Sequence, residues 1–195
     1  MFRTSARLKG IGIGSIFMAL FGGLWMVAAL NAASWVWLVA CVLLPTSLLL
    51  VRAVGMLVAS RQSRGLEPAP TVEESLMQRA QGRRFGWIFL TEAGAIVIVV
   101  NLLANAGRGN WILAAVGIIV GLHFLPLARL FETPLYYWTG GIQVALCLAI
   151  AGVMRSELAA ADPLVGLTMG LTLWATVVIL LVEGRRLMAA AMRES

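Results

Sequence analysis

Charged residues are scarce in this chain. They make up 12% of its 195 residues, whereas 61% are hydrophobic. Soluble domains carry about 25% charged and about 45–50% apolar residues, so this composition excludes an ordinary water-soluble domain. The formal net charge of +6 does not point to nucleic acid as a partner, because the basic residues lie at the ends of apolar segments rather than on one polar face.

Histidine and cysteine are also rare, with one and two residues. A single histidine excludes the HExxH motif and any two-histidine metal site within one chain. Cys41 and Cys147 fall inside apolar segments and are expected to be small buried side chains rather than a disulfide. Glycine-rich phosphate loops and Gly-x-Ser-x-Gly motifs are missing too, so the sequence names no catalytic residue, no metal ligand and no cofactor.

Long apolar runs are what the chain does contain. Six of them reach the length of about 20 residues that a membrane-spanning helix needs. They cover residues 9–31, 34–59, 84–106, 111–131, 136–155 and 163–183. We therefore predict one all-α membrane domain over residues 1–195, a polytopic bundle of six transmembrane helices. Because most connections are short, the helices should form three antiparallel hairpins, from helices 1–2, 3–4 and 5–6.

The basic residues predict the orientation of these helices. With the N-terminus in the cytoplasm, thirteen arginines and lysines fall on the inner side, and only Arg108 and Arg155 fall on the outer side. Membrane proteins retain arginine and lysine on the cytoplasmic side. Both termini are therefore predicted to be cytoplasmic, in a multi-pass protein of the inner (cytoplasmic) membrane, with the lipid bilayer as its main partner.

One soluble-like loop is expected, over residues 60–83. Within it, Thr71 and Glu74 have the spacing of a capping box, in which each side chain accepts a hydrogen bond from the other residue's amide. We predict a short amphipathic helix that starts there and carries Leu76 and Met77 on one side. This helix should lie at the inner membrane surface and run into the third spanning helix.

Gly-x3-Gly patterns occur at residues 10–14, 117–121 and 166–170. Small residues let helix backbones approach closely where apolar burial gives no advantage over lipid. These patterns predict close helix packing within the chain or, alternatively, a homodimer face.

Four polar residues, Arg52, Glu92, His123 and Gln143, each lie in a different apolar segment at one predicted depth. We call these four residues the polar layer. Each lies seven or eight residues from the predicted inner end of its segment, which is about 10–12 Å at 1.5 Å per residue. Charged side chains in hydrocarbon are costly, so they are usually paired or used in function.

Other polar side chains lie near this layer. Tyr136 shares a helical stripe with Gln143, because the two are seven residues apart. Ser15 in the first segment and Thr176 in the sixth come to a similar depth.

Two functions fit the polar layer. In the first, Arg52, Glu92, His123, Gln143 and Tyr136 line a pocket in the cytoplasmic half that binds or transports a small solute or ion. Arg52 would hold anionic groups there, while Glu92 and His123 would titrate. In the second, Arg52 and Glu92 form a buried ion pair that only holds helices together, in a non-catalytic structural or stress-response protein. In a variant of the second, Arg52 extends to the inner interface. An enzyme, or a haem protein with His123 as an axial ligand, is a third alternative.

The segment GLHFLPLARLF at residues 121–131 resembles a segment of small bacterial multi-helix membrane proteins of unknown activity. This resemblance implies a membrane protein and no particular activity. The layout of paired hairpins also resembles six-helix inner-membrane proteins of acid stress, at the level of architecture only.

Overall fold

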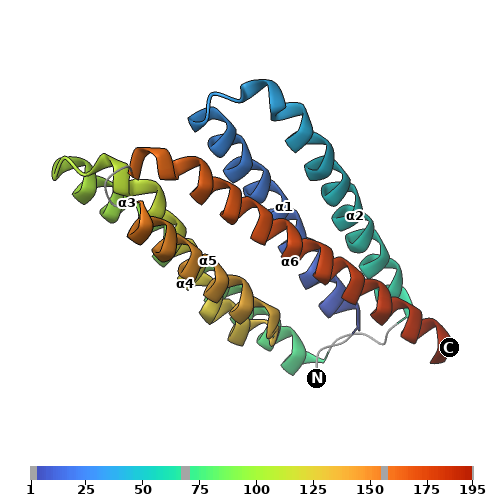
Figure 1. Cartoon of the computed structure of the whole chain (residues 1–195). Coiled ribbons are helices and arrows are strands. Elements are labelled where there is room, and N and C mark those ends of the chain that lie inside the picture. The colour runs from blue at the N-terminus through green and yellow to red at the C-terminus, as the bar shows by residue number, and fades with distance from the viewer. Residues whose placement is uncertain (1–3, 67–70, 155–157, 195) are drawn as a thin grey trace.

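Six long helices account for most of the chain in a computed structural model, which describes residues 4–66, 71–154 and 158–194 (Figure 1). They are α1 (Thr4–Ala32), α2 (Val39–Leu66), α3 (Val72–Asn105), α4 (Ile112–Leu130), α5 (Leu135–Val153) and α6 (Leu158–Glu194). Two 3₁₀ turns, η1 (Val36–Leu38) and η2 (Gly109–Trp111), lead into α2 and α4. No strand occurs among these described residues, so the predicted all-α class is confirmed.

All six helices are long and apolar enough to cross a membrane. Their outer faces carry large apolar side chains that are more than half exposed, among them Trp37, Leu44, Val51 and Val153. Soluble monomers rarely expose contiguous apolar surface of this extent. These features are those of a multi-pass membrane protein.

The central helix of the bundle is α6. It forms the most extensive helix pair with α1, and it also contacts α5, α2 and α4. Its buried residues Val165, Met169, Leu173, Val177 and Leu180 recur every three or four positions, which keeps them on one face. Figure 1 shows α3, α4 and α5 on one side of α6 and α2 on the other. The predicted hairpins pack as pairs, whereas the α1–α6 contact is one that the sequence does not predict.

Glycines bring α1 and α6 close together. A Cβ on Gly166 would lie 2.8 Å from the Trp25 carbonyl oxygen, and one on Gly170 would lie 2.9 Å from the Gly22 carbonyl oxygen. Real Cβ atoms do not approach a backbone oxygen this closely, so the crossing requires glycine. The Gly-x3-Gly pattern at residues 166–170 therefore packs within the chain.

The pattern at residues 117–121 brings α4 and α5 together in the same way. Gly121 lies against Gly140, and a Cβ on Gly117 would lie 2.6 Å from the Cys147 sulfur. Of the third pattern, Gly10 has no neighbour within 4 Å of its potential Cβ. A homodimer face at Gly10 stays a prediction.

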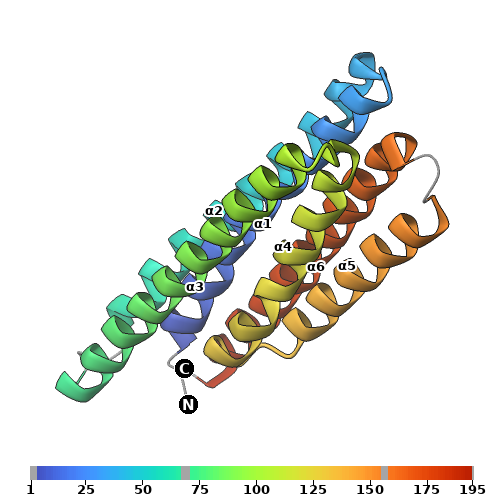
Figure 2. The ribbon, with the colours of Figure 1, turned by 90° about the vertical axis from the view of Figure 1, so that its left-hand side faces the viewer.

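The predicted loop helix and the third span form one continuous helix, α3, of 34 residues. The predicted capping box is confirmed, since the Glu74 amide donates to Thr71 Oγ1 over 3.2 Å and the Thr71 amide donates to Glu74 Oε2 over 2.8 Å. The first turns of α3 continue along its axis, as Figure 2 shows, and do not form a separate helix. Among the described residues, α3 packs substantially only against α4 and η2, and no residue of α3 is buried.

Candidate functional site

Glu92 and His123 are the members of the polar layer that the structure brings into contact. Glu92 Oε1 on α3 lies 3.2 Å from His123 Nδ1 on α4, and the two side chains are 10% and 15% exposed. This distance is that of an ion pair, but the direction is not that of a hydrogen bond. Both imidazole nitrogens therefore lack a hydrogen-bond partner among the described residues. The net charge of this pair depends on the imidazole, because His123 is charged only when protonated.

Arg52 lies apart from this pair. It is exposed on α2, and it has no ion pair or hydrogen bond within the described part of the chain. α2 packs against α1 and α6 and makes no extensive contact with α3, so the expected ion pair between Arg52 and Glu92 is not formed. The physical reason is the rotation of α2 about its own axis. The face of α2 that carries Leu49, Ala53 and Met56 is buried, so Arg52 points outward.

Gln143 on α5 is the most deeply buried residue of the polar layer, with 1% of its surface exposed. Neither Oε1 nor Nε2 has a hydrogen-bond partner within the described chain. Gln143 lies beside the close helix crossing at which Gly121 meets Gly140 and Val144. It is therefore level with His123 to within about one helical turn of 5.4 Å. Buried amides are normally hydrogen-bonded, so this unpaired amide requires an explanation.

Tyr136 lies two turns from Gln143, toward the end of the bundle where α1 begins and α6 ends (Figure 1). We call this the terminal end. The Tyr136 ring packs edge-on against Phe124 and Phe131, with centroid distances of 5.7 and 6.5 Å. Its hydroxyl reaches α1, where it lies 3.0 Å from the position of a Cβ on Gly14. The next residue, Ser15, is fully buried, and its hydroxyl has no partner among the described residues.

Thr139 is a further candidate, which the sequence did not indicate. Its Oγ1 lies 2.8 Å from Oγ1 of Thr176 on α6, and both residues are 2% exposed. Each hydroxyl also lies within hydrogen-bond distance of a carbonyl one turn earlier in its own helix. The signal that could have revealed Thr139 is its place between Tyr136 and Gln143 on one stripe of α5.

A comparison with protein families matches residues 85–183, just over half of the chain, to a family of unknown function, DUF7010. The chain belongs to the DUF7010 family. The matched range contains Glu92, His123, Gln143 and Tyr136, whereas Arg52 lies outside it. No curated protein and no solved structure matches the chain. The family brings no known activity, so the chemistry of the site has to be argued from its residues.

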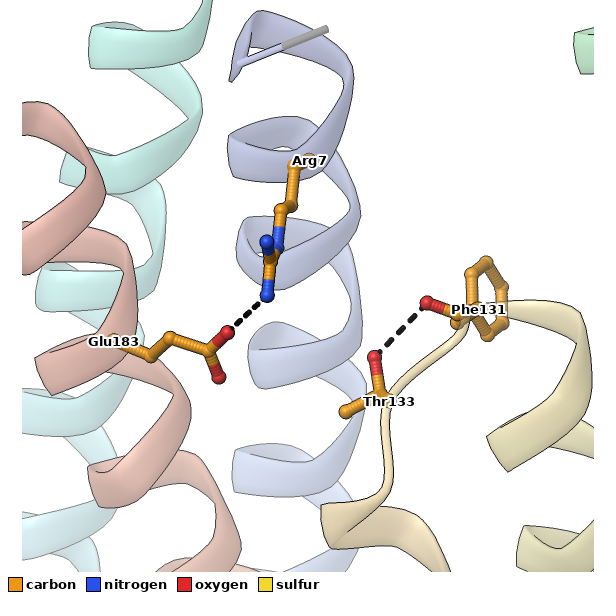
Figure 3. Close-up of polar contacts among 4 residues, drawn as sticks. All are labelled: Arg7, Phe131, Thr133 and Glu183. Carbon is orange, nitrogen blue, oxygen red and sulfur yellow. Dashed lines mark hydrogen bonds and ion pairs between the residues drawn. The ribbon is translucent and has the colours of Figure 1, made fainter. Parts of the chain in front are cut away.

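In this DUF7010 chain, an ion pair joins α1 to α6 at the terminal end. Arg7 Nη2 pairs with Glu183 Oε1, as Figure 3 shows. The same view shows the turn between α4 and α5, where Thr133 Oγ1 donates to the Phe131 carbonyl over 3.0 Å. Exposed ion pairs contribute at most about 1 kcal/mol to the free energy of unfolding. The main effect of Arg7 and Glu183 is therefore to place charged groups at the terminal end.

No group of three or more His, Cys, Asp or Glu side chains comes together in residues 4–66, 71–154 and 158–194. Two shallow apolar hollows lie on the surface of α5, one of them beside η2, and neither is lined by Glu92, His123 or Gln143. The candidate site is thus a set of buried polar side chains packed between helices.

Proposed function

We propose that this DUF7010 protein binds or transports a small solute or ion at Glu92, His123 and Gln143, in the half of the bundle nearest its terminal end. The observation that carries this proposal is the buried, unpaired amide of Gln143. Such an amide can donate two hydrogen bonds and accept two. An unpaired amide in an apolar interior costs roughly 2–7 kcal/mol, so a polar occupant would stabilise it.

The Glu92–His123 pair supplies the charge of this site. With a neutral imidazole the pair carries one negative charge, and with a protonated imidazole it carries none. A cation or a proton is therefore the ion that suits the pair best. An anionic ligand is less favoured, because Arg52, the side chain expected to hold it, lies on the outer face of α2.

The orientation of the bundle is part of the proposal. The terminal end would face the cytoplasm, because thirteen of the fifteen arginines and lysines lie at the ends of segments predicted to be on that side of the membrane. Arg52 would then extend toward the inner lipid headgroups, with its aliphatic part in the hydrocarbon. Glu92, His123 and Gln143 would lie in the cytoplasmic half of the inner membrane.

Ion binding predicts a change in thermal stability that depends on this site. In detergent, saturating NaCl, KCl or LiCl, compared with choline chloride at equal ionic strength, is expected to raise the unfolding midpoint by about 5 °C or more. If the ion is a proton, the unfolding midpoint is expected to depend on pH instead. Glu92→Gln and Gln143→Met are both expected to abolish the shift.

Asn101→Leu is the matched control, because Asn101 is exposed on α3 and donates to the Val97 carbonyl of its own helix over 2.7 Å. It should keep the full shift. Ion- or pH-dependent shifts that survive unchanged in both Glu92→Gln and Gln143→Met would place the binding site elsewhere.

A structural role is the second candidate, and one observation favours it. α3 has no buried residue and, within the described part of the chain, packs substantially only against α4 and η2. The Glu92–His123 contact therefore holds a weakly packed helix against α4. A purely structural tie predicts that no salt and no pH step shifts the unfolding midpoint through these residues.

A further inference from the structure

Three residues hold the buried polar atoms that lack a hydrogen-bond partner within the described chain: Ser15, His123 and Gln143. They come from three helices, α1, α4 and α5. Ser15 and Gln143 are each at most 1% exposed. Native interiors leave few such atoms unpaired, and a group of them commonly holds ordered water.

Taken by their positions along the bundle axis, these residues follow one another from the terminal end, and we call this order the line. The Tyr136 hydroxyl meets α1 at Gly14, beside Ser15. Thr139 and Gln143 follow Tyr136 on the same stripe of α5, and the distance along the axis from Tyr136 to Gln143 is about 10 Å. His123, across the α4–α5 crossing, lies within about one helical turn of the level of Gln143.

The contact between Thr139 and Thr176 lies in the middle of this line. The two hydroxyls have two hydrogens between them but three short contacts, one with each other and one with a carbonyl of each helix. The hydrogens can therefore occupy alternative positions, and lone pairs remain free to accept from water. Such a pair can accept a proton from one side and give up another on the other side.

We propose that a file of water molecules follows Ser15, Thr139, Thr176 and Gln143 and carries protons between the terminal end and the Glu92–His123 pair. This inference rests on the proposed function and names the proton as its ion. Each hydroxyl releases one proton as it accepts the next, and Gln143 orients water through Oε1 and Nε2 without gaining or losing a proton itself. The proton that enters at the terminal end is the one that His123 gains.

Other titratable groups are arranged in agreement with this direction. Glu183 on α6 and Arg7 on α1 pair at the terminal end, where the file begins. Cys147 on α5 lies one turn beyond Gln143, past the end of the file. Of the charged groups on helices that pack against α4, Glu92 is the one in contact with the imidazole within the described residues.

The single histidine makes the test direct. Protein labelled with ¹⁵N-histidine gives the signals of one imidazole, that of His123. NMR in detergent micelles then measures how fast its N–H exchanges with water. Gln143→Met and Ser15→Ala are each expected to slow this exchange at least about tenfold, because each removes a group that holds water in the file. Thr176→Val, which keeps the shape of the side chain, should act in the same direction.

Thr91→Val is the control, because Thr91 adjoins Glu92 but is exposed and donates to the Trp87 carbonyl of its own helix. Exchange that stays as fast in Gln143→Met and Ser15→Ala as in the wild type overturns the path, and so does equal slowing in Thr91→Val. The proposed function can survive that result, since the ion-dependent unfolding midpoint reports binding at Glu92 and Gln143, whereas exchange reports access to His123.

Discussion

Replacing His123 by leucine is expected to destabilise the protein by about 3–5 kcal/mol, because the Glu92 carboxylate would stay largely shielded from water without its partner. The Glu92 side chain is only 10% exposed in the intact pair. Glu92→Leu is expected to cost less, since the imidazole left behind can remain neutral. The double variant with leucine at both positions should lie nearest to the wild type, because apolar side chains replace both polar groups at once.

The measurement is a double-mutant cycle on the purified protein, with unfolding followed by heat or by a denaturing detergent. Thr91→Leu provides the control for an added leucine at the same level of α3, on an exposed position. A double variant that is less stable than His123→Leu would show that the loss of stability in His123→Leu does not come from an unpaired Glu92 carboxylate.

The same double variant separates the two candidate functions. If the pair only holds α3 against α4, the unfolding midpoint of the double variant responds to salt and pH as that of the wild type does. If the pair binds a cation or a proton, the double variant folds but loses the ion- or pH-dependent shift of its unfolding midpoint.

Replacing Gly140 by alanine is the second change with a large expected effect. A Cβ on Gly140 would run into the Gly121 carbonyl oxygen and would lie 3.0 Å from the Phe124 Cβ. Because the nearest atom belongs to the backbone of α4, relief requires the two helices to move apart, and overpacking of this kind costs about 1–3 kcal/mol. The unfolding midpoint should fall accordingly.

Gly141→Ala is the neighbouring control, since its potential Cβ has nothing within 4 Å. There alanine should leave the stability unchanged or raise it by up to about 1 kcal/mol, through its higher helix propensity. Equal effects of the two substitutions would contradict the close crossing of α4 and α5. Because Gln143 lies at this crossing, Gly140→Ala should also reduce any ion-dependent shift.

Much of the fold follows from local properties of the sequence. The lengths of the apolar segments predict all six helices, because a membrane-spanning helix has to be long and apolar by itself. The start of α3 depends on Thr71 and Glu74 alone, three residues apart, and is confirmed. Counting residues also brought Glu92, His123 and Gln143 to one level, since the rise per residue is constant along a helix.

The sequence by itself thus determined which segments form helices and how far along each helix a polar residue lies. Only the tertiary structure decided the rotation of the helices and their neighbours, which is why Arg52 points outward and Glu92 meets His123 instead. When nearly every face of a helix is apolar, periodicity does not reveal which face is buried. Helix pairing then depends on close backbone contacts, such as those at Gly166 and Gly170, and these contacts exist only once both helices are in place.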